Sequence, residues 1–270
     1  MLSRLTLTLL LILGLSVLSD AQQKNDLVGS YLYRFEWGGE ELTLKSNGSF
    51  ISHSSNCTSV FTSAGPYTVT NNILSLTTTK MSVRSYDEKK GHDLTKRKVR
   101  KQILDTDEPF KSDTEELQIV RWGERIYLMH LRQFGGFVAA INLGFEPREV
   151  DGYRAFYGEV FLRVGDENRP VYGPPHMPVE FLNQLLSAPI TATVINVESA
   201  GLRTIATIDR GSDDGLRKDM PLVTADSESF YYEQHWIISV EPHTATVQIW
   251  NDVKVGAQLT TRISNVRRYS

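Results

Sequence analysis

An acidic, glycine-containing stretch between two apolar runs is the first candidate for a site. Residues 207–224 read TIDRGSDDGLRKDMPLVT. A calcium loop needs oxygen ligands at alternate positions, Gly at the sixth position and Glu at the twelfth. Counted from Asp209, the third position is Gly211 and the sixth is Asp214, and neither matches. A phosphate-binding loop needs Gly-Lys followed by Ser or Thr before a helix, and the stretch has no such sequence.

The composition of this stretch is instead typical of a turn between strands. Gly residues accept positive φ, and Asp side chains accept hydrogen bonds from nearby backbone N–H groups. We therefore predict a structural turn that binds no essential ion, with an adventitious cation site as the alternative. The turn residues are Asp209, Gly211, Asp213, Asp214 and Gly215.

A stripe of aromatic residues near the N-terminus is the second candidate. Tyr31, Tyr33, Phe35 and Trp37 alternate with other residues, so in a strand they share one face. Such a stripe either fills the core of a barrel or lines the wall of a ligand cavity. Both interpretations remain open, and cavity lining is the possible functional role of the four residues.

The six histidines do not have the spacing of a metal site. No pair has the His-x-x-x-His spacing of a metalloprotease helix. His130 shares a predicted strand face with Ile126 and Leu128, which favours a packed side chain. His235 and His243 can meet across neighbouring strands, but two ligands do not complete a zinc site.

Other catalytic patterns are missing from the sequence as well. Cys57 is the single cysteine, so no intramolecular disulfide forms, and a packed thiol is the simplest reading. No Gly-x-Ser-x-Gly nucleophile motif occurs, and a glycosidase pair cannot be assigned among scattered carboxylates. We therefore expect no catalytic residue, cofactor or metal, and a protein that is not an enzyme.

The N-terminus has the composition of an export signal. Arg4 precedes the apolar residues 5–18, and Ser19-Asp20-Ala21 supplies small residues at a cleavage site. The apolar run is shorter than the roughly 20 residues of a membrane span. We predict cleavage after Ala21 and a mature chain that is periplasmic or extracellular, without a transmembrane segment. An uncleaved anchor is the alternative.

Charge gives little indication of a polyanionic partner. The net charge is −3, so we expect no nucleic-acid partner. Residues 84–102 are basic, but residues 105–116 are acidic and oppose the basic field within a screening length. We predict a solvated hairpin in 84–116 whose arms attract each other, with contact to a polyanion or an anionic membrane as the alternative.

Strand signals dominate residues 25–165. β-Branched and aromatic residues recur between closely spaced turn sequences, which favours an antiparallel barrel or sandwich. A three-residue loop at 46–48 would place Leu44 opposite Phe50, and residues 153–164 read as a further strand. Three hairpin turns are predicted, at Asn47-Gly48, Asn71-Asn72 and Gly123-Glu124.

The region after residue 165 reads as a linker, a helix and a second set of strands. Residues 165–178 contain four Pro and two Gly, Pro178 suits the first position of a helix, and Pro189 ends it. Alternation in residues 243–250 predicts that Ala245, Val247 and Ile249 share one face. The same argument assigns Trp236, Ile238 and Val240 to one face of the preceding strand.

The C-terminal segments IATIDRGSDDGLRKDMPLVT, IISVEPHTATVQIWND and VGAQLTTR resemble small β-barrel modules of bacterial envelope scaffold proteins. These modules occur in the periplasmic region of the rod-shape-determining MreC family and in periplasmic flagellar assembly factors. There, a strand ends in Gly-x-x-x-Gly and a Gly-Met-Pro-like step starts the next. Asp219 stands where Gly is usual, and the matching residues are Gly211, Gly215, Met220 and Pro221. The resemblance implies a scaffold that binds protein partners and brings no catalytic residues.

The N-terminal segments GSYLYRF and LTLKSNGSF resemble the start of small lipocalin-type barrels. The first strand of those barrels carries Gly-x-Trp, and here Tyr31 stands at the Trp position. A late Arg packs over that Trp in the family, so the resemblance implies that Arg163 packs over Tyr31. It implies a barrel architecture, and a barrel of this kind can carry a small apolar ligand.

The expected fold is all-β, with two small antiparallel β-barrel or sandwich domains joined by a Pro-rich linker and one short helix. The expected division is a signal peptide at 1–21, a lipocalin-like β-barrel domain at 25–165, a linker and short helix at 166–188, and a small β-barrel domain at 189–270.

The expected function is that of an exported, non-enzymatic scaffold or binding protein of the bacterial cell envelope that engages a protein partner. The alternative is a lipocalin-like carrier of a small apolar ligand in the N-terminal barrel. A cavity lined by Tyr31 to Trp37 would favour the carrier, and a filled barrel with exposed apolar sheet surface would favour the scaffold. A cluster of buried carboxylates would favour an enzyme.

Overall fold

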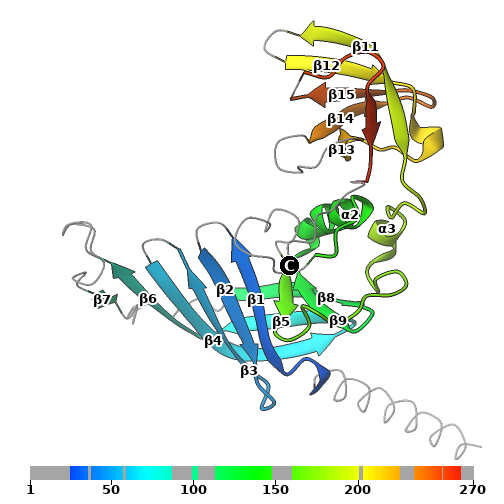
Figure 1. Cartoon of the computed structure of the whole chain (residues 1–270). Helices are drawn as coiled ribbons and strands as arrows, with labels where there is room; N and C mark the ends of the chain where they lie inside the picture. Colours follow the sequence, from blue (N-terminus) through cyan, green and yellow to red (C-terminus); the bar gives the residue numbers. More distant parts are fainter. Residues whose placement is uncertain are drawn as a thin grey trace, which may run out of the picture. The chain divides into compact units, whose positions relative to one another are not determined.

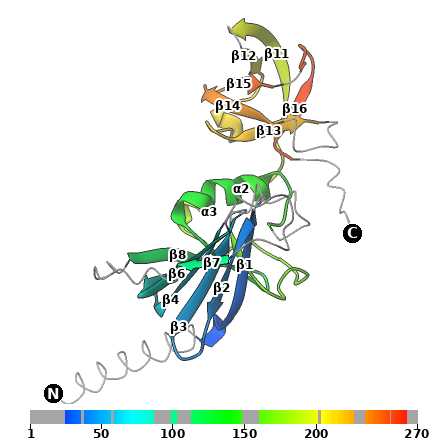
Figure 2. The ribbon, with the colours of Figure 1, turned by 90° about the vertical axis from the view of Figure 1, so that its left-hand side faces the viewer.

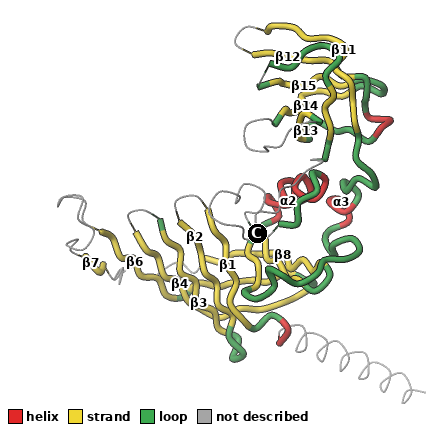
Figure 3. The backbone as a smooth tube through the Cα atoms, in the orientation of Figure 1, coloured by secondary structure: helices red, strands yellow, loops and turns green. Residues whose placement is uncertain are grey.

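The computed structural model describes residues 25–35, 38–56, 59–86, 99–102, 113–147, 160–200, 203–225, 234–250 and 252–262. The chain divides into two compact units, residues 1–134 with 148–178, and residues 135–147 with 179–270. Strands dominate both units and the helices are short (Figure 3). Within the described residues, no helix has the length and apolar character needed to span a bilayer.

The first unit contains a closed antiparallel barrel (Figure 1). Its strands pair in the order β1-β2-β3-β4-β5-β8-β9-β10, and β10 pairs again with β1. The bounds are β1 Gly29–Phe35, β2 Gly38–Leu44, β3 Ser49–Ser55, β4 Ser59–Thr70, β5 Ile73–Thr78, β8 Asp113–Trp122, β9 Arg125–Met129 and β10 Phe161–Arg163. Every neighbour in the ring is antiparallel, which confirms the predicted fold class for this unit.

A two-stranded ribbon, β6 (Lys80–Tyr86) with β7 (Val99–Gln102), branches from β4. The first half of β4 pairs with β6 and the second half with β5. The branch point is Gly65, where a Cβ atom would lie 1.9 Å from the carbonyl oxygen of Thr77. The predicted pairing of a basic arm with an acidic arm is wrong where it is described: the two basic strands β6 and β7 pair with each other, and the acidic residues Asp113–Glu116 pair with β5. Residues 87–98 and 103–112 lie outside the described residues.

The three predicted hairpin turns are confirmed. Leu44 lies opposite Phe50, as the three-residue loop requires. Asn71 and Asn72 have φ values of 53° and 62°, the left-handed conformation that a two-residue hairpin turn needs. Gly123 joins β8 to β9 with φ of 57°. Of the long strand predicted at 153–164, Phe161–Arg163 form β10, and residues 148–159 lie outside the described residues.

The barrel of the first unit is filled by side chains. Its buried core draws on every strand of the ring, since each strand turns alternate side chains inward. Tyr31 is fully buried, and Tyr33 packs against the core. The core residues are Leu27, Tyr31, Leu42, Leu44, Phe50, Tyr67, Val69, Leu74, Leu76, Leu117, Ile119, Ile126, Leu128 and Phe161.

The second unit contains a smaller closed barrel of strands β11-β12-β15-β14-β13-β16 (Figure 2). The bounds are β11 Thr191–Ala200, β12 Arg203–Ile208, β13 Pro221–Thr224, β14 His235–Val240, β15 Ala245–Ile249 and β16 Gln258–Thr260. Ala245, Val247 and Ile249 face its core as predicted, because β15 alternates between buried and partly exposed residues.

The prediction that Trp236, Ile238 and Val240 share one face of β14 is wrong for Val240. Trp236 and Ile238 are exposed, whereas His235 and Ile237 are buried in the barrel. The register of β14 against β15 shifts between Ile237 and Ser239. Such a bulge reverses the alternation after it, so Val240 packs against the core instead.

Two helices lie in the described part of the second unit. The predicted helix after Pro178 forms only one turn, α3 (Val179–Leu182), and continues as tighter turns. A second helix, α2 (Phe134–Asn142), was not predicted. The side chain of Asn142 donates to the carbonyl of Gln184 (3.1 Å) and accepts from the N–H of Leu186 (2.9 Å), so α2 fixes the segment that follows α3.

Candidate functional site

The acidic stretch forms a tight turn between β12 and β13. Residues Ser212–Asp214 form a single 3-10 turn, and Gly215 closes it with φ of 95°. The prediction of a positive φ is wrong for Gly211, because its φ of −141° is extended. A Cβ atom there would lie 2.2 Å from the carbonyl oxygen of Glu241, so backbone approach requires this glycine. Asp219 has φ of 63°, the left-handed conformation that glycine adopts most easily.

The carboxylates of the turn contact protein groups, and Asp209 and Asp214 both pair with Arg210, at 3.9 and 3.6 Å. Asp209 accepts a hydrogen bond from the N–H of Thr193 at 2.6 Å, and Asp214 accepts one from the N–H of Gly211 at 3.0 Å. Asp213 lies 3.4 Å from the imidazole of His243. Within the described residues, no group of three or more His, Cys, Asp or Glu side chains is placed to hold a metal ion. The turn geometry thus accounts for each carboxylate without an ion.

The aromatic stripe is packed where it is described. The hydroxyl of Tyr31 donates to the carbonyl of Leu27 at 2.9 Å, and burial raises the pKa of this phenol. The ring of Tyr33 meets that of Phe161 edge-on, with centroids 5.7 Å apart. Phe35 is described by its backbone alone and Trp37 lies outside the described residues, so cavity lining by these two stays a prediction.

The histidines are spread over both units. His130 follows β9 and pairs with Glu115 on β8, with 2.9 Å between Nε2 and Oε1. Burial raises the pKa of the Glu115 carboxyl, and the His130 charge opposes that rise. His235 is buried in the second barrel, whereas His243 is almost fully exposed beside Asp213. His235 and His243 therefore do not form a common site.

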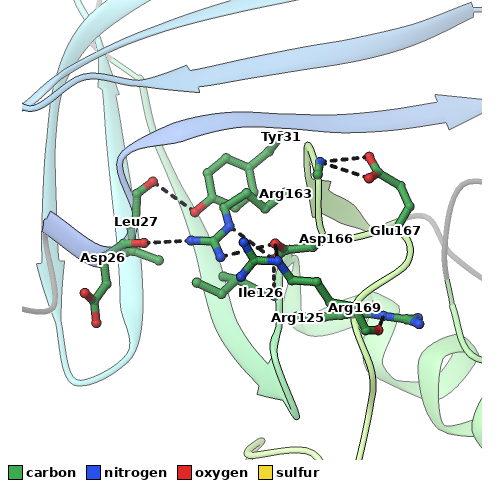
Figure 4. Close-up of polar contacts among 10 residues, drawn as sticks. Asp26, Leu27, Tyr31, Arg125, Ile126, Arg163, Asp166, Glu167 and Arg169 are labelled. Atoms are coloured by element: carbon green, nitrogen blue, oxygen red, sulfur yellow. Dashed lines mark hydrogen bonds and ion pairs between the residues drawn. The ribbon is translucent and has the colours of Figure 1, made fainter.

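The buried carboxylate of Asp166 and the arginines around it form a network that was not predicted from the sequence (Figure 4). Asp166 is fully buried and accepts three hydrogen bonds. Oδ2 accepts from Nε of Arg163 (3.1 Å) and the N–H of Ile126 (3.0 Å). Oδ1 accepts from Nη2 of Arg163 (3.2 Å) and forms an ion pair with Nε of Arg169 (3.1 Å).

The barrel strands position this network. Arg163 lies directly opposite Tyr31 in the β1–β10 ladder. Its Nη1 donates to the carbonyl of Asp26 at 3.1 Å. Arg125 at the start of β9 is buried, and its Nε donates to the carbonyl of Arg169 at 2.7 Å. The network therefore ties β1, β9 and β10 to the loop after β10.

A pocket of about 300 Å³ lies beside this network, and we call it the arginine pocket. It is open to solvent and lies within the first unit. Four guanidinium groups and two carboxylates line it. The lining residues are Asp26, Arg121, Gly123, Glu124, Arg125, Ile126, Arg163 and Arg169.

The loop expected to be a linker forms one wall of the arginine pocket. The N–H of Glu124 donates to the carbonyl of Pro170 at 3.1 Å, and the indole N–H of Trp122 donates to the carbonyl of Gly173 at 2.8 Å. A Cβ atom at Gly123 would lie 2.5 Å from that Pro170 oxygen. Residues 166–178 therefore belong to the first unit and pack against the β8–β9 turn.

The arginine pocket could not be predicted from local sequence patterns. Its arginines come from β8, β9, β10 and the following loop, which are far apart in the sequence. One local signal exists, the spacing Arg163-x-x-Asp166-x-x-Arg169. In a loop, two arginines three residues on either side of an aspartate can both reach its carboxylate, as they do here.

The outer face of the second barrel carries exposed apolar side chains. Trp236 lies opposite Gln248 in the β14–β15 ladder. Trp250 follows Gln248 by two residues, directly after β15, so the alternation of the strand predicts the same face for it. The exposed fractions of Trp236 and Trp250 are 37% and 64%, and Ile238 beside Trp236 is 38% exposed. We call Trp236, Ile238 and Trp250 the tryptophan face.

Comparison with known proteins does not assign the chain to a family. The chain matches no protein-family model, and no curated protein is similar to it.

Proposed function

We propose that this protein is an exported, non-enzymatic binding protein of the bacterial cell envelope that engages a protein partner through the tryptophan face. The observation that carries the proposal is the exposure of two indoles, Trp236 and Trp250, on adjacent strand segments of one small barrel. Trp is enriched among the residues that contribute most to protein–protein affinity. Its ring buries a large apolar area while its N–H binds a polar partner group.

The closed barrel restricts how a partner can bind this unit. A sheet with a free edge can bind an extra strand through its backbone. In the barrel of β11 to β16 every strand has two neighbours, so the contact is made by side chains of the outer face. The resemblance to envelope scaffold modules supports the same function.

The alternative, a carrier of a small apolar ligand, has weaker support. Tyr31 is fully buried and Tyr33 packs against the core, so these two side chains fill space inside the barrel. The arginine pocket is lined largely by charged side chains, which suit a polar ligand. A lipocalin-like architecture is compatible with the ring of eight strands, but the filled interior favours the scaffold.

The test is capture of a partner from envelope extract by the purified protein, followed by mass spectrometry. We expect a partner that is retained by the wild type and lost with a Trp236→Ser, Trp250→Ser double variant. Tyr172→Ser is the matched control, because Tyr172 is an aromatic residue of the first unit with 63% exposure. Equal capture by all three proteins, or no protein enriched by the wild type, contradicts the proposal.

A further inference from the structure

We propose that the arginine pocket binds the phosphate or sulfate group of a small molecule. This site is separate from the tryptophan face and does not depend on the function proposed for it. The first argument is the supply of hydrogen-bond donors. Each guanidinium carries five N–H groups, and the protein uses only some of them around this pocket.

Arg121 and Arg169 hold most of the unused donors. In the described part of the chain, the Arg121 side chain makes one long ion pair, in which its Nη2 lies 3.8 Å from Oδ2 of Asp26. Arg169 uses its Nε on Asp166, and its two Nη groups contact no acceptor among the described residues. Both side chains line the arginine pocket, so their free N–H groups face a ligand or water.

The buried carboxylate does not neutralise the pocket. Asp166 accepts three hydrogen bonds and pairs with Nε of Arg169, so its charge is already held by protein groups. It offsets one positive charge, while four arginines line the cavity. The two lining carboxylates, Asp26 and Glu124, are exposed, so water and salt screen their charge more than that of a buried group. An excess of positive charge therefore remains at the inner wall.

The arginines reach the pocket from separate elements, and this arrangement favours a tetrahedral oxyanion as the ligand. A planar carboxylate is satisfied by the fork of a single arginine, and Asp166 already binds Arg163 in that way. In the pocket the guanidinium groups come from β8, from the end of β10 and from the loop after it. Donors that approach from separate elements suit a group with three or four oxygens pointing in different directions.

The size and rim of the pocket limit the rest of the ligand. A volume of about 300 Å³ is at the lower end of the range for small-molecule sites. It admits one oxyanion with a small organic group. Asp26 and Glu124 accept hydrogen bonds from hydroxyl groups and repel a second anionic group, so the pocket selects a compact, singly phosphorylated or sulfated molecule over a polyanion.

The pocket is held open by its backbone as well as its side chains. Gly123 combines φ of 57° with a Pro170 carbonyl oxygen 2.5 Å from the position of a Cβ atom. The β8–β9 turn and the loop after β10 are therefore in direct backbone contact, joined by the Glu124 to Pro170 hydrogen bond. This backbone contact fixes the main-chain positions from which Arg121 and Arg169 reach the pocket.

The test is isothermal titration calorimetry of the purified protein with inorganic phosphate, sulfate and glycerol 3-phosphate, at an ionic strength held constant with sodium chloride. We expect saturable binding that Arg121→Gln weakens by about tenfold or more, because a charge-assisted hydrogen bond is lost. Arg132→Gln is the matched control, since Arg132 is an exposed arginine of the same unit outside the pocket. It should leave the affinity within about twofold.

A second variant covers the case in which Arg121→Gln does not fold. Asp26→Asn removes a carboxylate that competes for Arg121, while the Asp26 carbonyl still accepts from Arg163. We expect it to tighten phosphate binding several-fold. Tighter binding of glycerol 3-phosphate than of inorganic phosphate identifies a phosphomonoester ligand, and the reverse order identifies the free ion. Absence of saturable binding, or equal weakening by Arg121→Gln and Arg132→Gln, overturns the proposal.

Discussion

Arg163 binds Asp166 through two parallel hydrogen bonds, 3.1 Å from Nε to Oδ2 and 3.2 Å from Nη2 to Oδ1. The pair closes a short loop at the end of β10, because Gly165 between the two residues has φ of 91° and turns the chain back. The same carboxylate holds the start of β9 through the N–H of Ile126. One buried aspartate therefore fixes both strands next to the arginine pocket.

Replacement of Asp166 should be among the most destabilising polar substitutions in the first unit. Asp166→Asn leaves Arg163 with a neutral partner in a buried position, and removal of one partner of a buried ion pair costs roughly 3 kcal/mol or more. Urea unfolding of the wild type and the variant measures the difference. Asp252→Asn is the control, because Asp252 is exposed. A loss equal to that of the control would show that Asp166 is not needed to hold the two strands.

The turn at 209–215 should depend on its glycines and not on an ion. Gly215→Val should lower the free energy of unfolding by roughly 1–3 kcal/mol, because a β-branched residue is strained at φ of 95°. Asp213→Asn should change the melting temperature little, since the Asp213 to His243 contact is exposed. Thermal melts with calcium and with EDTA check both expectations. A calcium-dependent rise in the wild type that Asp213→Asn abolishes would instead identify a cation site.

Substitution of Gly211 tests whether close approach of the backbone at residues 241–242 requires glycine, because no backbone strain is involved there. Its φ is extended, so alanine is conformationally allowed, but a Cβ atom would meet backbone oxygens of Glu241 and Pro242 at 2.2 and 2.5 Å. Gly211→Ala should therefore lower the melting temperature of the protein. Ser212→Ala, at an exposed neighbouring position, is the control. Equal melting temperatures for the two variants would mean that the β14–β15 turn moves away without cost.

Glu115 should make stability depend on pH. Burial raises the pKa of its carboxyl above the ordinary value of 4.5, so the folded state binds this proton more tightly than the unfolded state. Its contribution to stability is therefore lost as pH rises from that ordinary value through the raised one. Melting temperatures measured across this range should fall less with Glu115→Gln than with wild type. Glu116→Gln, at the neighbouring exposed position, should melt like the wild type at each pH.

The parts of the fold that local sequence determines were predicted well. The left-handed turn residues Asn71 and Asn72 fix a two-residue hairpin wherever they occur between strands. The alternation of β15 follows directly from its residues. In contrast, the bulge in β14 depends on its pairing with β15, and helix α2 contains Gly135 and Gly136, which are weak helix formers.

The arginine pocket was not predictable for a related reason. Its lining residues become neighbours only after β8, β9 and β10 take adjacent places in the barrel. In the sequence, no local pattern distinguishes Arg121 and Arg163 from the other Lys and Arg residues. Burial of Asp166 distinguishes them, and burial is a property of the folded chain. The turn at 209–215 was recognised because the positive φ of Gly215 and the cap by Asp214 lie within a few residues, whereas the close approach of Glu241 to Gly211 exists only in the folded barrel.

The branch at β4 leaves one strand of the first unit open on its outer side. In the described part of the chain, β7 pairs with β6 alone, so its outer backbone groups can accept another strand. Five of the seven residues 96–102 are Lys or Arg. Two copies that approach along this edge repel each other, and salt weakens that repulsion. Within β7 itself, Arg100 and Lys101 place positive charge along this edge, and such charge disfavours edge-to-edge pairing of two copies, most strongly at low ionic strength.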